Sequence, residues 1–565
     1  MAIFDEEKQN KQLDDLHKEE EEQLVATLAE SKYGLPYIDL YRLGIDNEAL
    51  RAISHEDAMQ MKVAPFKLFG KNIFIAVRSP SDDLFKTLKD SMERINLVPA
   101  FYMASGASLQ KVWDRYQELS MAEGSKIGGL DISPQVLRDT VKNINHMQDI
   151  EKLVREALEG NKIHKISRLL EIILAGAIAI KASDIHIEPE KDRGRLRLRL
   201  DGVLQDINFF GLDIYRLLNS RIKLLSGMKL TSKIAQDGRF SIMEEKEEIS
   251  VRTSLIPGAY GESIVMRILD PKAIAVKMEE LGIEPYLFSI IETEIAKPNG
   301  LILVTGPTGS GKTTTLYAFL QRIYSPEIKI ITIEDPIEYH LDGVTQTQTN
   351  DKKGYTFAEG LRSGLRQDPD VVMVGEIRDG ETAGIAIQAA LTGHIVFSTL
   401  HTNNAAGVIP RLIDLEVNPK IMVSALSLSI AQRLVRKLCE SCKKESAPTE
   451  EENGVIKLVL ESIKEEGKDL AKYKINPDAS FKLFAPVGCD KCNNIGYKGR
   501  IGIFEAIKTD EAIEKIIPQN PSEHEIKKVA RTQGILSMRQ DGIVKILNGV
   551  TSIAEVQSVV DLKEE

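Results

Sequence analysis

Residues 306–313 read Gly-Pro-Thr-Gly-Ser-Gly-Lys-Thr and match the pattern G-x-x-x-x-G-K-[ST] at every position. The match follows an apolar run at 301–305 and precedes a helical pattern at 314–324, which is the context that a phosphate-binding loop requires. We expect Lys312 to reach the β- and γ-phosphates of ATP and the Thr313 hydroxyl to bind Mg²⁺. The residues expected to bind the nucleotide are Gly306, Pro307, Thr308, Gly309, Ser310, Gly311, Lys312, Thr313 and Thr314.

Two carboxylates could complete such a site, because hydrolysis also needs oriented water and neutralised charge. Glu334 closes the apolar run 330–334, and Glu376 follows the apolar run 371–375. Ligands of open α/β sheets bind at the carboxyl ends of the strands. We therefore expect Glu334 and Glu376 to be catalytic, with solvated strand-end carboxylates as the alternative.

Two histidines bracket a further apolar run at residues 395–400, namely His394 before it and His401 after it. A single histidine most often packs or caps an element. One at each end of a strand could instead sense the γ-phosphate, and the spacing alone leaves both interpretations open.

The composition of the chain excludes some classes of function. The chain has 565 residues with 42% hydrophobic residues and a formal charge of −11, so we expect a soluble protein of several domains that does not wrap nucleic acid. Its start carries no apolar run of signal-peptide length, and its longest apolar stretch, 172–180, is too short to span a bilayer. We therefore expect a cytoplasmic protein whose membrane contact is peripheral.

Continuous apolar strands that alternate with helices from residue 284 onward predict a parallel sheet buried on both faces. Nearer the N-terminus, residues 67–77 predict paired strands around a turn, and residues 82–95 predict a helix. The units expected are an acidic tail (1–23), an N-terminal α/β domain (24–120), a linker (121–149), a second domain that opens with a long helix (150–270), an ATPase domain (284–500) and a polar helical region (501–565).

The stretch 194–207 alternates strictly between polar and apolar residues, which predicts a strand with one buried face. Arg195, Arg197 and Arg199 share its other face. Because the chain is acidic overall, we expect this arginine face at a domain or subunit surface and not on nucleic acid.

All four cysteines stand in two C-x-x-C pairs, Cys439 with Cys442 and Cys489 with Cys492. Two such pairs suit tetrahedral Zn²⁺ bound by four thiolates, whereas a redox C-x-x-C motif usually occurs singly. We expect a structural zinc element over residues 439–492, with a helical insert in its charged spacer.

Taken together, these motifs resemble those of a known protein family. The segments "TGPTGSGKTTTLYA", "IEDPIEYHLDGVTQTQTN", "GLRSGLRQDPDVVMVGEIRDGETAGIAIQAALTGHIVFSTLHTNNA" and "AQRLVRKLC" resemble, in order, conserved segments of the traffic ATPases of type IV pilus assembly and type II secretion. The resemblance implies an α/β multidomain protein with a RecA-like P-loop NTPase core, a preceding PAS-like α/β domain, a small N-terminal α/β domain and a tetracysteine zinc element.

The resemblance also assigns roles to residues. It implies that Glu334 positions or activates the attacking water, that Glu376 serves the Mg²⁺ site, and that His394 and His401 belong to nucleotide-sensing elements. Glu376 departs from the family pattern, which usually has Asp at that place. The family supplies arginines from its second domain across a subunit boundary, and the residues that match here are Arg239, Arg252 and Arg267.

The implied function is that of a hexameric ATP hydrolase that powers pilus assembly through an inner-membrane platform protein and a cytoplasmic adaptor. The tetracysteine element favours assembly or export, since retraction motors of the family typically lack it. A type II secretion or competence-pilus ATPase is the alternative, and a DNA-transport motor is the remote one, opposed by the acidic balance of the chain.

A third alternative is a nucleotide or second-messenger receptor with a degraded ATPase. Some family members bind a cyclic dinucleotide in the N-terminal domain through a paired Arg-Leu-Gly motif. This chain has only one such motif there, Arg42-Leu43-Gly44, so we expect no cyclic-dinucleotide binding.

Overall fold

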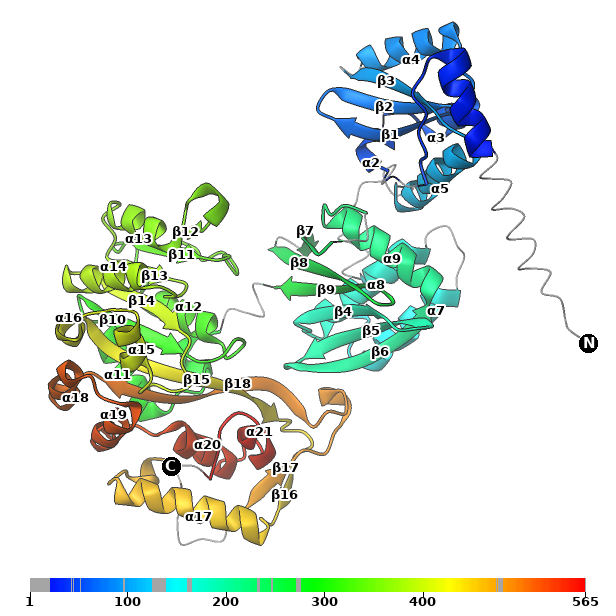
Figure 1. Cartoon of the computed structure of the whole chain (residues 1–565). Coiled ribbons are helices and arrows are strands. Elements are labelled where there is room, and N and C mark those ends of the chain that lie inside the picture. Colours follow the sequence, from blue (N-terminus) through cyan, green and yellow to red (C-terminus); the bar gives the residue numbers. More distant parts are fainter. Residues whose placement is uncertain are drawn as a thin grey trace, which may run out of the picture.

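The computed structural model describes residues 21–41, 43, 45–50, 52–94, 97–123, 139–159, 165–230, 234–244, 247–270, 276–473, 475 and 481–563 (Figure 1). They form an N-terminal, a second and a C-terminal unit, each around its own sheet. Within these ranges, no helix is both long and apolar enough to cross a membrane. Arg42 and Gly44, on which the expectation about cyclic dinucleotides rests, lie outside the described residues.

The N-terminal unit is a small α/β domain whose sheet has the order β1 (Val63–Phe69), β2 (Asn72–Val77), β3 (Val98–Met103). β1 and β2 pair antiparallel, as the sequence predicts for residues 67–77, and β3 pairs parallel to β2. Its helical elements are η1 (Ala29–Tyr33), α2 (Asn47–Leu50), α3 (His55–Gln60), α4 (Asp82–Arg94) and α5 (Gly106–Glu123).

The end of the acidic tail expected over residues 1–23 contacts the N-terminal domain. Residues 1–20 lie outside the described residues, but residues 21–23 are helical and contact the N-terminal domain. Glu21 pairs with Arg78, and Glu22 accepts a hydrogen bond from the Ser108 hydroxyl at 2.9 Å. These carboxylates lie at the start of α5, where the helix dipole favours negative charge.

The second unit has an antiparallel sheet in the order β6-β5-β4-β9-β8-β7. It begins with α7, before the expected boundary at residue 150, and the long helix expected as the opening element comes second, as α8. The bounds are α7 (Met147–Glu159), α8 (Lys165–Ala179), β4 (Asp184–Pro189), β5 (Arg193–Leu200), β6 (Val203–Gly211), α9 (Leu212–Leu225), β7 (Gln236–Glu244), β8 (Glu247–Gly258) and β9 (Gly261–Leu269).

The alternation along β5 gives this sheet its two faces. Leu196, Leu198 and Leu200 are buried in one hydrophobic cluster with residues of α7 and α8. The intervening arginines face the other side, because successive side chains of a strand point in opposite directions. The predicted division of this strand into an apolar and an arginine face is therefore confirmed.

The C-terminal unit contains a sheet in the order β12-β11-β13-β14-β10-β15-β18, in which β18 alone runs antiparallel to its neighbour. Its strands are β10 (Gly300–Thr305), β11 (Ile330–Glu334), β12 (Thr345–Gln348), β13 (Val371–Val374), β14 (Ile395–Leu400), β15 (Leu426–Leu438) and β18 (Tyr497–Lys508). A separate two-stranded sheet pairs β16 (Lys444–Ser446) with β17 (Leu483–Ala485).

Helices cover both faces of this sheet, which explains the continuous apolar runs in its sequence. On β10, Leu301 and Leu303 face one hydrophobic cluster, and Ile302 and Val304 face the other. The helices are α11 (Pro285–Ile295), α12 (Lys312–Ile323), α13 (Phe357–Leu365), α14 (Gly380–Leu391), α15 (Val408–Asp414), α16 (Pro419–Ala425), α17 (Glu450–Glu465), α18 (Glu511–Ile516), α19 (Glu523–Ala530), α20 (Met538–Leu547) and α21 (Ile553–Gln557).

The boundary expected at residue 501 is wrong. Residues 501–508 belong to β18, which pairs with β15 along most of its length, so the helical region starts only at α18. The strand forms because Ile503, Phe504 and Ala506 are buried in the sheet's own core. The helical insert expected between the cysteine pairs is present as α17.

Candidate active site

The carboxyl ends of four neighbouring strands meet at one edge of the C-terminal sheet. β10, β14, β13 and β11 are parallel neighbours, with Thr305 opposite Leu400 and Ile333 opposite Val374. At this edge the Thr305 hydroxyl lies 2.8 Å from the Thr402 hydroxyl, which ties the end of β10 to the segment after β14. Residues brought to this edge are the phosphate loop, Glu334, Glu376 and His401.

The backbone of the phosphate loop adopts conformations at two positions that favour glycine. Gly306 has φ +147° and Gly311 has φ +88°, a region that favours glycine. A Cβ atom at Gly306 would lie 2.5 Å from the carbonyl oxygen of Gln432 on β15, so no larger residue fits there. Gly311 is the N-cap of α12, whose first turn carries Lys312 and Thr313.

The loop fits the phosphates of a nucleotide. Lys312 Nζ donates to the carbonyl oxygens of Gly306 at 2.8 Å and Pro307 at 3.2 Å, so the ammonium lies folded over the loop. Burial lowers the pKa of Lys312, and the nearby Glu376 partly offsets this. Among the described residues, the buried Ser310 Oγ has no hydrogen-bond partner. A phosphate would supply both an anion for Lys312 and an acceptor for Ser310.

Glu334 is a buried carboxylate held by donors from three elements. Tyr317 on α12 and Thr332 on β11 donate hydroxyl hydrogen bonds to it, and Gln346 on β12 donates at 3.1 Å. Burial raises the pKa of Glu334, and these hydrogen bonds only partly counteract it. The carboxylate is therefore both oriented and more basic than an ordinary glutamate, which suits a group that accepts a proton from water.

Glu376 lies beside Arg378 and His401 at the same edge. Its carboxylate is 2.5 Å from Arg378 Nη2 and 3.4 Å from His401 Nε2. Burial alone would raise the pKa of Glu376, but Arg378 and His401 outweigh this effect and lower it. The side chain therefore stays ionised near Lys312, as a ligand of a divalent cation must.

His394 lies at the opposite edge of the sheet, so the structure does not bring it to the phosphate loop. It precedes β14, and its backbone carbonyl accepts a hydrogen bond from Gly300 at the start of β10. Its Nδ1 lies 3.0 Å from the carbonyl oxygen of Ala389, so it caps the end of α14. The length of β14 separates it from the loop by about 20 Å, and the packed or capping alternative is the one that the structure supports.

The three arginines expected to serve another subunit form one row across the second domain. Arg239 on β7 is directly opposite Arg252 on β8, which is directly opposite Arg267 on β9. Arg252 lies 3.2 Å from Glu338 and also donates to the carbonyl oxygen of Ile337. Arg239 is exposed. The row therefore presents several guanidinium groups on one face of the sheet.

The row continues to β4 and β5 through Asp184, which is opposite both Arg267 and Arg199. Asp184 is buried, and its carboxylate oxygens lie 3.0 Å from Arg267 Nε and 3.3 Å from Arg199 Nε. A buried carboxylate between two arginines fixes the position of both guanidinium groups.

Carboxylates of the same sheet neutralise the other arginines of β5. Arg195 makes a two-pronged contact with Asp206, at 2.6 and 2.9 Å, and Arg197 pairs with Glu188. An arginine face already paired in this way is poorly suited to binding phosphodiester backbones.

The cysteines form a second candidate site, remote in sequence from the phosphate loop. The Sγ atoms of Cys439, Cys442, Cys489 and Cys492 all lie within 4.8 Å of one another. Four thiols that converge without pairing as disulfides have the donor set of a tetrahedral zinc site.

Sequence reasoning missed the residues that hold the functional groups in place. Tyr317 binds Glu334, and Gln432 accepts a hydrogen bond from Thr315 of α12 at 2.7 Å. Tyr317 looked like one more apolar position of a helix, and Gln432 lies far along the chain from the loop that it supports. One sequence feature could have pointed to Gln432. It is a polar residue within an apolar strand, β15, in which it is buried.

The chain is similar to known proteins over most of its length. The family model described as "Type II/IV secretion system protein" matches residues 159–558. A type II secretion system protein E from Aeromonas hydrophila is 44% identical over 79% of this chain and 86% of its own length. A type IV pilus assembly ATPase PilB from Myxococcus xanthus is 34% identical over 95% of this chain and 91% of its own length.

A solved structure supports the fold. The X-ray structure of the ATPase DotB from Yersinia pseudotuberculosis aligns with a TM-score of 0.51 at 19% identity, over 70% of this chain and 94% of that one. At this identity the likeness concerns the fold, and it agrees with a RecA-like sheet that carries the phosphate loop directly after β10.

Proposed function

Because the chain belongs to the type II/IV secretion system protein family, a family of traffic ATPases, we propose that it is the ATP-hydrolysing motor of type IV pilus assembly. The observation that carries the ATPase assignment is the convergence of Lys312, Glu376 and His401 at the edge where Glu334 ends β11. The pilus-assembly relative aligns with 95% of the chain, including its N-terminal domain, which supports that machine. The relatives of type II secretion align with higher identity, so a secretion motor is the second candidate.

In this proposal each residue at the edge has one task. Lys312 leaves the loop carbonyls and binds the β- and γ-phosphates, and Ser310 donates to a phosphate oxygen. Thr313 and Glu376 would hold Mg²⁺, which would neutralise charge on the phosphates. Glu334 accepts the proton of the attacking water, with Tyr317, Thr332 and Gln346 fixing its carboxylate.

Further positive charge for the transition state comes from the arginine row of another copy. Arg239 is exposed, and Arg252 beside it is held by groups that directly follow β11 in its own chain. A row of this kind can stabilise charge on the transferred phosphoryl group only if it faces a phosphate loop. Six copies in a ring would give every loop such a neighbour, because a head-to-tail interface closes into a ring.

The proposal also includes a zinc ion bound by the four cysteines. It further places the motor at the cytoplasmic face of the inner membrane. The convergence of the four thiols supports the metal. The names of the relatives support partners in a pilus or secretion machine, and in this chain those would be an inner-membrane platform protein and a cytoplasmic adaptor.

Steady-state ATP hydrolysis by the purified full chain tests the motor assignment, with each sample also sized by chromatography. We expect activity in an assembly of about six subunits, and its loss in Glu334→Gln without loss of the assembly. Full activity of Glu334→Gln, or of a monomer, would contradict the proposal. Deleting the gene should abolish surface pili and leave exported proteins unchanged, and the reverse pattern would favour the secretion alternative.

A further inference from the structure

The four-cysteine cluster closes the outer end of the longest strand pair in the described C-terminal unit. β15 and β18 pair from Leu428 opposite Lys508 to Leu438 opposite Tyr497, and Cys439 follows directly. Cys439 donates its backbone N–H to the Gly496 carbonyl at 2.9 Å. We call residues 439–442 and 488–496 the knuckle. It is therefore a direct extension of the C-terminal sheet.

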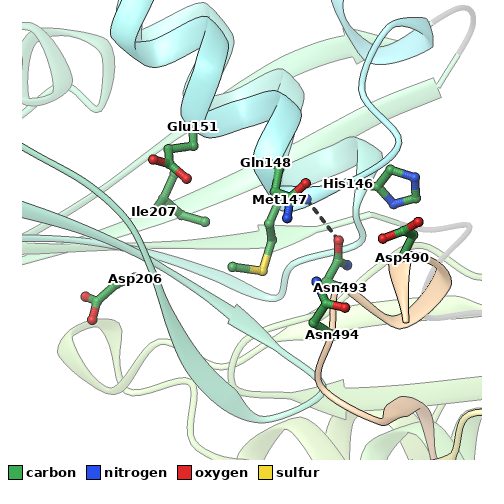
Figure 2. Close-up of a pocket in the computed structure, with 9 residues that line it drawn as sticks. All are labelled: His146, Met147, Gln148, Glu151, Asp206, Ile207, Asp490, Asn493 and Asn494. Carbon is green, nitrogen blue, oxygen red and sulfur yellow. Dashed lines mark hydrogen bonds between the residues drawn. The ribbon is translucent and has the colours of Figure 1, made fainter. Parts of the chain in front are cut away.

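The knuckle contacts the second domain of the same chain. Asn493 Oδ1 accepts a hydrogen bond from the backbone N–H of Met147, at 2.9 Å across 346 residues of sequence (Figure 2). Met147 is the first residue of α7, and the first N–H groups of a helix have no partner within it. The knuckle thus supplies a missing acceptor to α7.

Two further contacts surround this hydrogen bond. Ile495 packs against the hydrophobic cluster of the second domain, which includes Ile207. Asp201, in the turn between β5 and β6, accepts a hydrogen bond from the Gly499 N–H at 2.8 Å. A cavity of about 140 Å³ lies between the two sides, lined by Glu151 and Asp206 from one and by Asp490 and Asn494 from the other (Figure 2).

The conformation that makes these contacts depends on the cysteines. Asn493 directly follows Cys492 and has φ +51°, and Asn494 has φ +60°. Cys492 accepts hydrogen bonds through Sγ from the N–H groups of Cys489 at 3.2 Å and Gly496 at 3.2 Å. A metal bound at Cys489 and Cys492 would hold both ends of the turn that directly precedes Asn493.

The same strand pair reaches the phosphate loop. Gln432 on β15 accepts a hydrogen bond from Thr315 of α12, and its carbonyl oxygen lies against Gly306. From Gln432 to Cys439 the strand spans roughly 24 Å. β15 therefore runs without a break from the nucleotide loop to the knuckle, which contacts the second domain.

We propose that the knuckle is the seat on which the second domain docks onto the C-terminal unit of its own chain, and that bound metal keeps this seat formed. The metal half of this inference rests on the zinc assigned under the proposed function. The docking half rests on Asn493, Ile495 and Asp201. Movement of the second domain against the C-terminal unit must then pivot at, or break, the Asn493 contact.

Hydrogen exchange of the zinc-loaded full chain tests both halves, followed at the peptide that contains Met147. The variant is Asn493→Gly, which keeps the positive φ but removes the acceptor. The matched control is Asn494→Gly, which makes the same change at the next residue and leaves its backbone hydrogen bond to Cys489 in place. We expect exchange about five-fold faster in Asn493→Gly and no change in Asn494→Gly, with bound zinc retained in both.

Removal of zinc by a chelator should accelerate exchange of the same peptide in the wild type. Unchanged exchange in Asn493→Gly would overturn the docking half, and unchanged exchange after verified zinc loss would overturn the metal half. Wild-type protein purified without bound zinc would also overturn the metal half. Because none of these readouts depends on ATP hydrolysis, a failure here is distinguishable from a failure of the motor assignment.

Discussion

Arg239 and Arg252 stand directly opposite one another on β7 and β8, so their side chains lie on the same face of the sheet. Like charges in such positions destabilise a sheet by themselves. Arg267, next in the row, is paired with Asp184, and Arg252 is paired with Glu338, whereas Arg239 is exposed. A row built in this way is suited to an anion that comes from outside the domain.

Replacing Arg239 should therefore remove catalysis without weakening the fold. We expect Arg239→Ala to lower kcat by about 10³-fold, the scale of a lost arginine finger. We also expect it to leave stability unchanged or to raise it by about 0.5 kcal/mol, because a like-charge pair disappears. Arg216→Ala, which removes an exposed arginine of α9, serves as the control. Normal kcat in Arg239→Ala would show that the row has another purpose.

Tyr317 should set the pH at which Glu334 works. Burial raises the pKa of Glu334 above its ordinary value, so we expect hydrolysis to fall as the pH decreases through a value above 4.5. The Tyr317 hydrogen bond lowers that pKa, so Tyr317→Phe should move the acidic limb of the pH–rate profile to higher pH. It should also lower kcat by about tenfold.

The control for this substitution is Tyr324→Phe, at the exposed end of the same helix. A Tyr317→Phe enzyme that is slower at every pH, with an unshifted acidic limb, would indicate that the hydroxyl merely stabilises the packing. Burial raises the pKa of Tyr317 itself well above its usual range, so its hydroxyl donates throughout the accessible pH range.

Two loop glycines should respond differently to the same change. Gly306→Ala would place a Cβ 2.5 Å from a backbone oxygen, whereas Gly309→Ala would meet nothing within 4 Å, although both positions have positive φ. We expect Gly306→Ala to lower the melting temperature of the nucleotide-free protein clearly more than Gly309→Ala, which adds only about 1 kcal/mol of backbone strain. Equal shifts would mean that the Gly306–Gln432 approach does not constrain the loop.

The features that could be predicted from the sequence are those encoded within one short segment. The phosphate loop, the strand before it and the helix after it are contiguous, and Glu334 and Glu376 each end an apolar run. The parallel direction of the strands then places both carboxylates at the loop's edge. The same rule places His394, which precedes β14, at the other edge, so the spacing of the two histidines carried less information than the strand direction.

The features that could not be predicted depend on how distant segments register. The alignment of Arg239, Arg252 and Arg267 requires the pairing of three strands, and a slip by one residue would turn an arginine to the other face. Residues 501–508 look locally like the start of the polar helical region that follows them. Their pairing with β15 is a tertiary contact that the local sequence does not show.

Mixing two inactive variants tests most directly whether one active site is shared between two copies. Glu334→Gln and Arg239→Ala subunits, co-assembled in equal amounts, are assayed for ATP hydrolysis. If the arginine row serves a neighbouring copy, about a quarter of the interfaces regain both groups in a head-to-tail ring, and activity returns toward that fraction of the wild-type rate. If the mixed assemblies stay as inactive as each variant alone, every site uses its own chain's arginines, and the shared site is refuted.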